Sequence, residues 1–410
     1  MKRWVVMSLG LLVALPTSAA DLLIRGATVH VGDGSAALAN TDVHVRDGRI
    51  AAMGSALAVA GATVIEAKGR PLTPGLFGGV TALGLEEVSL EPSTVDNAVG
   101  GAEPDLAAPW RPEFDVSVAF NPSSSVIPVS RVEGITFAAI APNAAPGGSF
   151  VAGQGALIGL SGKLDSVLPA SASLYIELGG SASPQAGGSR AAQFMMLEQA
   201  IGDARTSQDD ERELLTRAGK AVFARYMQGG RVAFRVDRAS DIVAVMKLSV
   251  KAGFKPIIVG GAEAWRVANR LAAAKVPVVL DPLVNLPSSF DRLAARLDNA
   301  ALLEQAGVEV VFSHFGDATH NARKIRQLAG NAWAHGLSHA GALRAITDAP
   351  ARVFGAKDRG RIALGKHADL VLWTGDPLAL DSWPEQVWIE GEAQPMRSRQ
   401  TELRDRYLNR

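Results

Sequence analysis

The segment "VVFSHFGDATHNAR" places two histidines and an aspartate directly after an apolar stretch. Imidazole and carboxylate groups are common zinc ligands, and a catalytic zinc site uses three protein ligands and one open position. His314, Asp317 and His320 therefore form a candidate metal site. The alternative, which the pattern favours, is that the same side chains cap the loop and hydrogen-bond within it.

Polar residues also follow several other expected strands, where a barrel mouth would gather them. They are Glu86, Arg131, Arg190, Arg235, Asp237, Glu263 and Asp281. Arg235 and Asp237 are two residues apart, so they share a strand face and could pair. Arginine also binds carboxylates well, so Arg190 and Arg235 could hold a carboxylate-bearing ligand. Together with Asp237, they are the candidate substrate-binding residues. The alternative is that these charges form ion pairs that stabilise loops.

Apolar strands alternate with helices between residues 73 and 355. The expected strands include "GITFAAIAP", "RVAFRV", "KPIIVGG", "VPVVLDP" and "VEVVFSH", and one long helical stretch is expected from about Ser189 through "KAVFARYM". Such alternation predicts a parallel α/β fold whose strands are buried on both faces. The length favours a closed (β/α)8 barrel over an open sheet. A segment rich in Ser, Gly and Pro, residues 178–190, is either a lid over the barrel mouth or a surface insertion.

Short alternating strands and turns occupy both ends of the chain. They predict one small β-sandwich built from residues 21–72 and 356–395, flanking a barrel of residues 73–355, with a tail or helix at 396–410.

Composition excludes several classes of function. The chain has 410 residues, a formal net charge of zero and 20% charged residues. Without a basic excess we expect no nucleic-acid partner. No glycine-rich phosphate motif opens a helix, which disfavours a nucleotide-binding fold. The expected ligand is a small molecule at the barrel mouth.

The first twenty residues have the layout of a secretory signal peptide. Lys2 and Arg3 precede an apolar run, and small residues end at Ala20. The run is shorter than the roughly 20 residues of a membrane span. We expect cleavage after Ala20 and an exported, periplasmic protein without a membrane anchor. The absence of cysteine suits an oxidising compartment and excludes a thiolate nucleophile.

Several segments resemble the amidohydrolase superfamily, especially its imidazolonepropionase-like branch. They are "DLLIRGATVHVGDG", "VRDGRIAAMG", "ATVIEAKGRPLTPGL" and "ALRAITDAPARVFGAKDRGRIALGKHADLVLWTGDPL". The resemblance implies a distorted barrel with a β-sandwich and metal-assisted hydrolysis of amide or cyclic C–N bonds. It also implies that Asp317 is the final aspartate, which binds metal and takes the proton of the attacking water.

The other ligands that the resemblance implies are missing. The His-x-His pair after Pro-Gly-Leu is replaced by Val80 and Ala82. The strands that should each supply a histidine offer Arg235 and Asp237, or Val259 and Gly260, and no bridging lysine appears near "SLYIELGG". His335 and His339 are four apart, but Gly336 and Ser338 predict a helix end and a new helix start between them.

Two functions follow from the sequence. The first is a hydrolase of C–N bonds with an altered site that holds one zinc ion through His314, Asp317 and His320. The second is a non-catalytic periplasmic binding or accessory protein that holds no metal. An oligomer, or a paired homologue that completes the site, is compatible with either.

Overall fold

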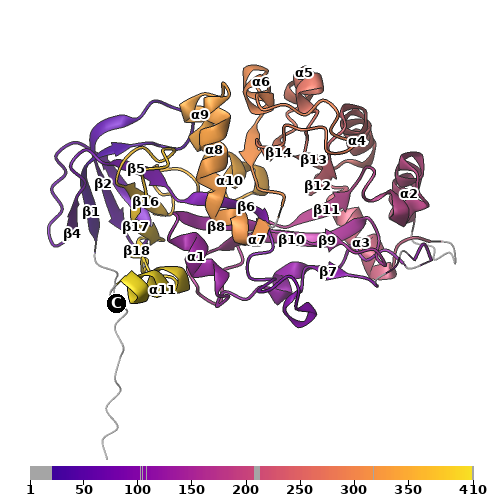
Figure 1. The fold of residues 1–410 in the computed structure, drawn as a ribbon, viewed down its shortest axis with the longest axis horizontal. Coiled ribbons are helices and arrows are strands. Elements are labelled where there is room, and N and C mark those ends of the chain that lie inside the picture. The colour runs from indigo at the N-terminus through magenta and orange to yellow at the C-terminus, as the bar shows by residue number, and fades with distance from the viewer. Residues whose placement is uncertain are drawn as a thin grey trace, which may run out of the picture.

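The computed structural model describes residues 21–408 except 102, 104, 108, 207–212 and 317. The expected signal peptide and Asp317 therefore lie outside the described residues. Figure 1 shows a small sheet beside a larger barrel, whose helices lie along its outer side.

The barrel is a single eight-stranded sheet of order β15-β14-β13-β12-β11-β10-β8-β6. Its strands are β6 (Leu76–Thr81), β8 (Ile135–Ile140), β10 (Val151–Gly159), β11 (Ser173–Glu177), β12 (Arg231–Val236), β13 (Lys255–Gly260), β14 (Val278–Leu280) and β15 (Val310–Phe312). β10 runs antiparallel to both of its neighbours, whereas the other paired strands are parallel. The result is a distorted, nearly closed barrel of the expected α/β type.

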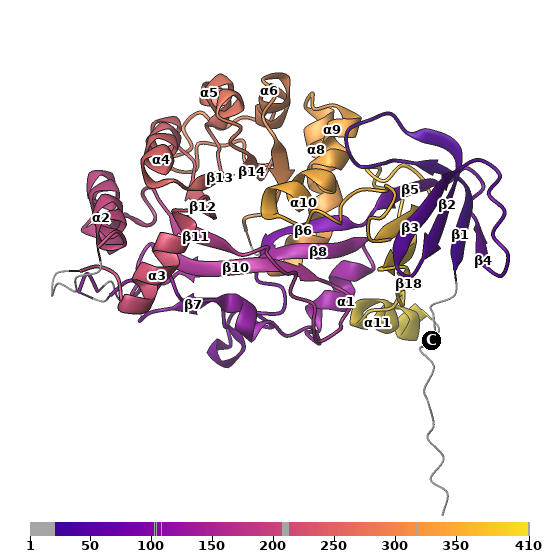
Figure 2. The ribbon, with the colours of Figure 1, turned by 180° about the vertical axis from the view of Figure 1, so that it is seen from behind.

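Helices pack around this sheet (Figure 2). They are α1 (Val126–Arg131), α2 (Arg190–Asp203), α3 (Arg217–Tyr226), α4 (Ala239–Ala252), α5 (Ala268–Ala273), α6 (Asn299–Gln305), α7 (Ala318–Asn321), α8 (Ile325–Ala334), α9 (His339–Arg344) and α10 (Asp348–Phe354). Short 3-10 turns are η1 (Pro92–Thr94), η2 (Val116–Ala119), η3 (Ser183–Ala186), η4 (Ala264–Val267) and η5 (Ala322–Lys324).

The expected long helix from Ser189 is in fact two helices, α2 and α3. Before α3, the backbone N–H of Trp110 donates to the carbonyl of Leu214, and Trp110 forms a bridge with Leu215. This pairing holds the segment extended until Thr216 caps α3 by accepting from the N–H of Gly219. By contrast, the expected break between His335 and His339 is confirmed, since Gly336 has φ +101° and Ser338 caps α9.

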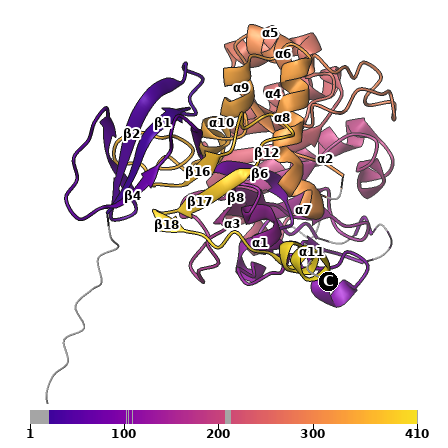
Figure 3. The same ribbon diagram turned by 60° about the vertical axis from the view of Figure 1, so that its left-hand side comes forward.

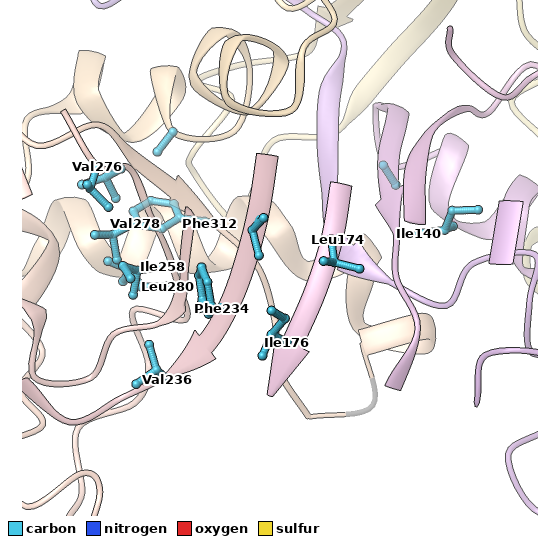
Figure 4. Close-up of a cluster of buried hydrophobic side chains, with 14 of the residues drawn as sticks. Ile140, Leu174, Ile176, Phe234, Val236, Ile258, Val276, Val278, Leu280 and Phe312 are labelled. Atoms are coloured by element: carbon cyan, nitrogen blue, oxygen red, sulfur yellow. The ribbon is translucent and has the colours of Figure 1, made fainter. Parts of the chain in front are cut away.

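Alternate residues of the strands separate into two apolar clusters. One cluster lies between the sheet and its helices and includes Ile176, Phe234 and Ile258 (Figure 4). The other fills the barrel interior and includes Tyr175, Ala233 and Val259. This two-residue alternation follows from the pleat, and it explains why the strands are apolar along their whole length.

Two glycines permit close approaches next to and within β6, Gly75 to β8 and Gly79 to the end of β15. At Gly75, inside the Pro-Gly-Leu motif, a Cβ would collide with the side chain of Thr136. Gly79 has φ +89°, and a Cβ there would lie 2.9 Å from Oγ of Ser313. Ser313 accepts the N–H of Val80 at 2.9 Å, which joins the end of β15 to β6. Between these edge strands, the N–H groups of Phe77 and Phe312 donate to the carbonyls of Ile346 and Ala345.

Both ends of the chain contribute to the second large sheet, whose order is β18-β17-β16-β5-β1-β2-β3 with β4 also paired to β1 (Figure 3). Its strands are β1 (Leu22–Val29), β2 (Leu38–Arg46), β3 (Arg49–Gly54), β4 (Thr63–Glu66), β5 (Pro71–Pro74), β16 (Leu370–Trp373), β17 (Pro384–Ile389) and β18 (Glu392–Ala393). A separate pair joins β7 (Ala98–Val99) to β9 (Asn143–Ala144). The β-sandwich expected for the terminal blocks stays a prediction, since the described strands form one sheet.

The last helix is α11 (Arg399–Leu408), which lies near α1 (Figure 1). Among the described residues, no helix is both long and apolar enough to cross a membrane.

Candidate functional site

A cavity of about 1030 Å³ opens at the carboxyl ends of the barrel strands. Val80, Ala141, Val259 and Phe315 line it and also belong to, or pack against, the apolar cluster of the barrel interior. Strand ends and loops supply polar groups around these side chains. This is the end of the barrel where enzymes of this architecture place their active sites.

Glu86 and Asn97 line the cavity from the segment after β6. The buried Asn97 donates from Nδ2 to Oε2 of Glu86 at 3.3 Å. The backbone of Asn97 accepts from the N–H of Asn143, and the adjoining β7–β9 pair ties this segment to the one after β8. The wall that carries Glu86 is therefore held by main-chain hydrogen bonds.

Arg235, at the end of β12, binds Glu177 of the neighbouring strand β11 as an ion pair and donates to Oδ1 of Asn143 at 2.9 Å. Its guanidinium also lies 5.7 Å from the ring centroid of Tyr175 inside the barrel. Burial raises the pKa of that tyrosine far above its ordinary value, although the nearby Arg235 works in the opposite direction. Tyr175 therefore stays protonated and uncharged.

Arg235 and Asp237 do not pair, contrary to expectation. Asp237 instead accepts from Nε of Arg292 at 2.6 Å and from the N–H of Ala262. The two residues do both line the cavity. Each finds its partner on a different element, Glu177 on β11 and Arg292 in the loop after β14, which intra-strand spacing does not reveal.

Arg190, the first residue of α2, pairs with Asp291 and lies 3.2 Å from Oδ2 of Asp241. The second carboxylate oxygen of Asp291 accepts from the N–H of Gly180 at 2.7 Å. These contacts join the 178–190 segment to the loop after β14 across the cavity. All three predicted substrate-binding residues thus lie at the mouth, and all three are held in ion pairs.

His314 lines the cavity directly after β15. Its Nδ1 accepts from the N–H of Gly316 at 3.1 Å, so neutral His314 carries its proton on Nε2 in this arrangement. Asp281 Oδ2 lies 3.9 Å from the same Nδ1 and accepts from the N–H of Phe315. Asp281 therefore secures the loop and does not orient His314 as a general base.

The described residues do not fit the paired-histidine metal centre that the resemblance implies. Val80 and Ala82 are buried and apolar, and Arg235 and Asp237 are engaged in ion pairs. His320 is exposed on α7 and does not line the cavity. Over the part of the chain that the structure describes, no group of three or more His, Asp or Glu side chains could hold a metal ion. The site of His314, Asp317 and His320 stays a prediction, because Asp317 lies outside that part.

The remaining predicted mouth residues serve the loops. Arg131 donates to the carbonyls of Leu160 and Ser161. Glu263 accepts from the N–H groups of Ala239 and Ala294. Neither residue lines the cavity. Both therefore stabilise loops, which is the alternative role considered above for the charged residues that follow the strands.

The cavity residues that were not anticipated include Asn143, Glu177, Asp291 and Arg292. Glu177 offered a usable signal, since a charge that ends an otherwise apolar strand marks the strand's carboxyl end. Asp291 and Arg292 lie in an irregular loop whose sequence carries no such signal.

Part of the chain is similar to known amidohydrolases, and its fold is similar to solved structures. Residues 192–393 match the model of the Amidohydrolase family. A stretch of 75 residues is 41% identical to the amidohydrolase tasK of Hapsidospora irregularis, covering 18% of this chain and only 8% of that protein. An amidohydrolase structure from Thermotoga maritima MSB8 aligns with a TM-score of 0.78 at 23% identity, over 91% of this chain and 99% of that one. A zinc-bound adenosine deaminase from Xanthomonas campestris aligns with a TM-score of 0.51 at 19% identity, over 92% and 93%. The family match covers just under half of the chain, and the structural likenesses show that the fold is shared.

Proposed function

We propose that the barrel mouth of this protein takes a small polar molecule with an amide-type C–N bond and holds it without a paired-histidine metal centre. The match to the amidohydrolase family supports a hydrolase of C–N bonds as the general class. The finer assignments, namely the imidazolonepropionase-like branch, export to the periplasm and a partner that completes the site, belong to the same proposal.

The observation that carries the proposal is the composition of the cavity. Its apolar part includes Val80, Ala141, Val259 and Phe315, and its polar part combines ion-paired side chains and neutral hydroxyl and amide groups with Glu86 and His314. Small-molecule sites are typically concave and mostly apolar, with a few placed polar groups that fix orientation. An amide fits such a lining, because it has one donor, one acceptor and apolar flanks.

A second candidate is hydrolysis by an altered metal site that includes His314, Asp317 and His320. The observation that favours it is the position of His314, which lines the cavity right after the last barrel strand. A bound zinc ion would polarise the amide carbonyl and lower the pKa of a bound water. His314 would contribute a ligand on this reading.

A combined test separates the two candidates. The protein from residue 21 onward is purified, its metal content is measured, and glutarimide, N-acetyl-dialanine and N-pentylacetamide are tested for binding by calorimetry and for hydrolysis by mass spectrometry. We expect binding of an amide without stoichiometric zinc. We also expect binding to be lost in Ser181→Trp, which fills the cavity from an exposed position, and kept in Val250→Trp, which is exposed on α4 away from it.

Two results would overturn the first candidate. Stoichiometric zinc with hydrolysis that is lost in Asp317→Ala would establish the second. Failure of all three amides to bind, at concentrations well above millimolar, would remove amides as the ligand class.

A further inference from the structure

Among the described residues, one charged side chain around the cavity has no oppositely charged partner. Its lining contains the carboxylates of Glu86, Glu177, Asp237 and Asp291 and the guanidiniums of Arg190, Arg235 and Arg292. Each guanidinium pairs with one lining carboxylate: Arg235 with Glu177, Arg292 with Asp237, and Arg190 with Asp291. Among the residues that the structure describes, Glu86 has only the neutral amide of Asn97 as a side-chain partner.

Glu86 is also firmly placed. Its backbone forms bridges with Leu83 and Val95, and the N–H of Asp96 donates to the carbonyl of Leu85 at 2.9 Å. Asn97, which donates to its carboxylate, is buried. A carboxylate held in this way is a preorganised acceptor, so a ligand meets it with little cost of ordering.

The rest of the lining limits what can meet this charge. The guanidiniums already face carboxylates, so they offer an anionic ligand less attraction than free arginines would. The apolar side chains of Val80, Ala141 and Val259 favour an uncharged body. A partly enclosed carboxylate without a counter-ion attracts a positive group, and a charge-assisted hydrogen bond is the stronger kind.

We propose that Glu86 determines specificity, selecting ligands whose amide-bearing body ends in a protonated amine. This inference rests on the proposed function, because it assigns one end of the amide ligand to Glu86. The arginines suggested a ligand that carries a carboxylate. Because they are already paired, we propose a ligand that carries a positive charge.

The test uses three amides of equal length that differ in one terminal group. N-acetylputrescine ends in an ammonium, N-pentylacetamide in a methyl group and N-acetyl-5-aminovalerate in a carboxylate. Their dissociation constants are measured by calorimetry at low and high salt for the wild-type chain, Glu86→Gln and Glu198→Gln. In Glu86→Gln, the glutamine keeps an oxygen that can accept from Asn97. Glu198→Gln is the control, because it removes the same charge from an exposed position on α2 away from the cavity.

We expect the ammonium compound to bind about tenfold more tightly than the methyl compound, as one charge-assisted hydrogen bond provides. The preference should shrink at high salt, vanish in Glu86→Gln and persist in Glu198→Gln. The wild-type salt series tests the same point if Glu86→Gln does not fold.

The outcomes separate the two proposals. Equal binding of the ammonium and methyl compounds, tighter binding of the carboxylate, or a preference that survives Glu86→Gln would overturn the role of Glu86 and leave amide binding intact. If none of the three compounds binds, the proposed function fails and this inference fails with it.

Discussion

At the residue scale, each of the three arginines that line the mouth of this barrel pairs with a carboxylate that also lines it. Val80 and Ala82 occupy the positions where the resemblance implies histidine ligands. Arg235, on a strand that should supply another, instead brings a positive charge that Glu177 and Asn143 bind. The positive charge of Arg235 is thus balanced by the carboxylate of Glu177.

Replacing Arg235 tests how much this ion pair contributes to stability. In Arg235→Ala, Glu177 loses its cationic partner in a half-buried place, so we expect the free energy of unfolding to fall by about 1–3 kcal/mol. Urea unfolding measures it. Arg266→Ala is the control, since Arg266 is half exposed and lies 3.8 Å from Glu263, and it should cost less than about 1 kcal/mol. Equal losses in the two variants would show that the Arg235 pair is no stronger than a surface pair.

At the element scale, the barrel is closed by side-chain and loop contacts, because β6 and β15 do not pair directly. Gly79 brings β6 close to Ser313, and the carbonyls of Ala345 and Ile346 accept from the two edge strands. The closure adjoins Val80, which lines the cavity. The shape of the mouth therefore depends on this junction.

Removing the hydroxyl of Ser313 should weaken the junction. In Ser313→Ala the buried N–H of Val80 loses its acceptor, so we expect a loss of about 1–3 kcal/mol in unfolding free energy and faster amide exchange in β6. The control is Ser289→Ala, which lies exposed at the mouth and should change stability by no more than about 0.5 kcal/mol. Unchanged exchange at Val80 would contradict the role given to Ser313.

At the scale of the whole molecule, a histidine contact joins the terminal sheet to the barrel. His30, which follows β1, lies 6.0 Å from His339 of α9 between ring centroids, and His339 packs edge-on against Trp333 of α8. His339 in turn binds Asp376, which follows β16. Burial lowers the pKa of His30 below its ordinary value of 6.5, and the charge of His339 lowers it further, while Asp376 acts in the opposite direction.

This contact should make stability depend on pH. The unfolded chain takes up a proton on His30 at a higher pH than the folded chain does, so the free energy of unfolding falls as the pH drops from about 6.5 through the lower folded pKa. A single titrating group changes the free energy of unfolding by at most about 1.4 kcal/mol per pH unit. His30→Phe keeps a ring and removes the titration, so its pH profile from denaturant unfolding should be flatter over this range. An unchanged profile would assign the effect to other groups.

Much of the architecture follows from the sequence itself. The alternation of apolar strands with helices predicted parallel strands buried on both faces, and the structure has such strands, together with the antiparallel β10, in a nearly closed barrel. Local signals also placed the break at Gly336 and Ser338, because helix ends depend on a few neighbouring residues. The presence of Val80 and Ala82 where the resemblance implies a His-x-His pair is likewise read from the sequence.

The pairing of charges at the mouth was decided only by the tertiary structure. Spacing within one strand suggested that Arg235 would meet Asp237, yet each binds a group on another element. Such partners are remote in the chain and are brought together by the closure of the barrel. Whether Glu86 has a counter-ion therefore depends on every other pair at the mouth, since each arginine can neutralise a carboxylate only where the folded strands and loops place it.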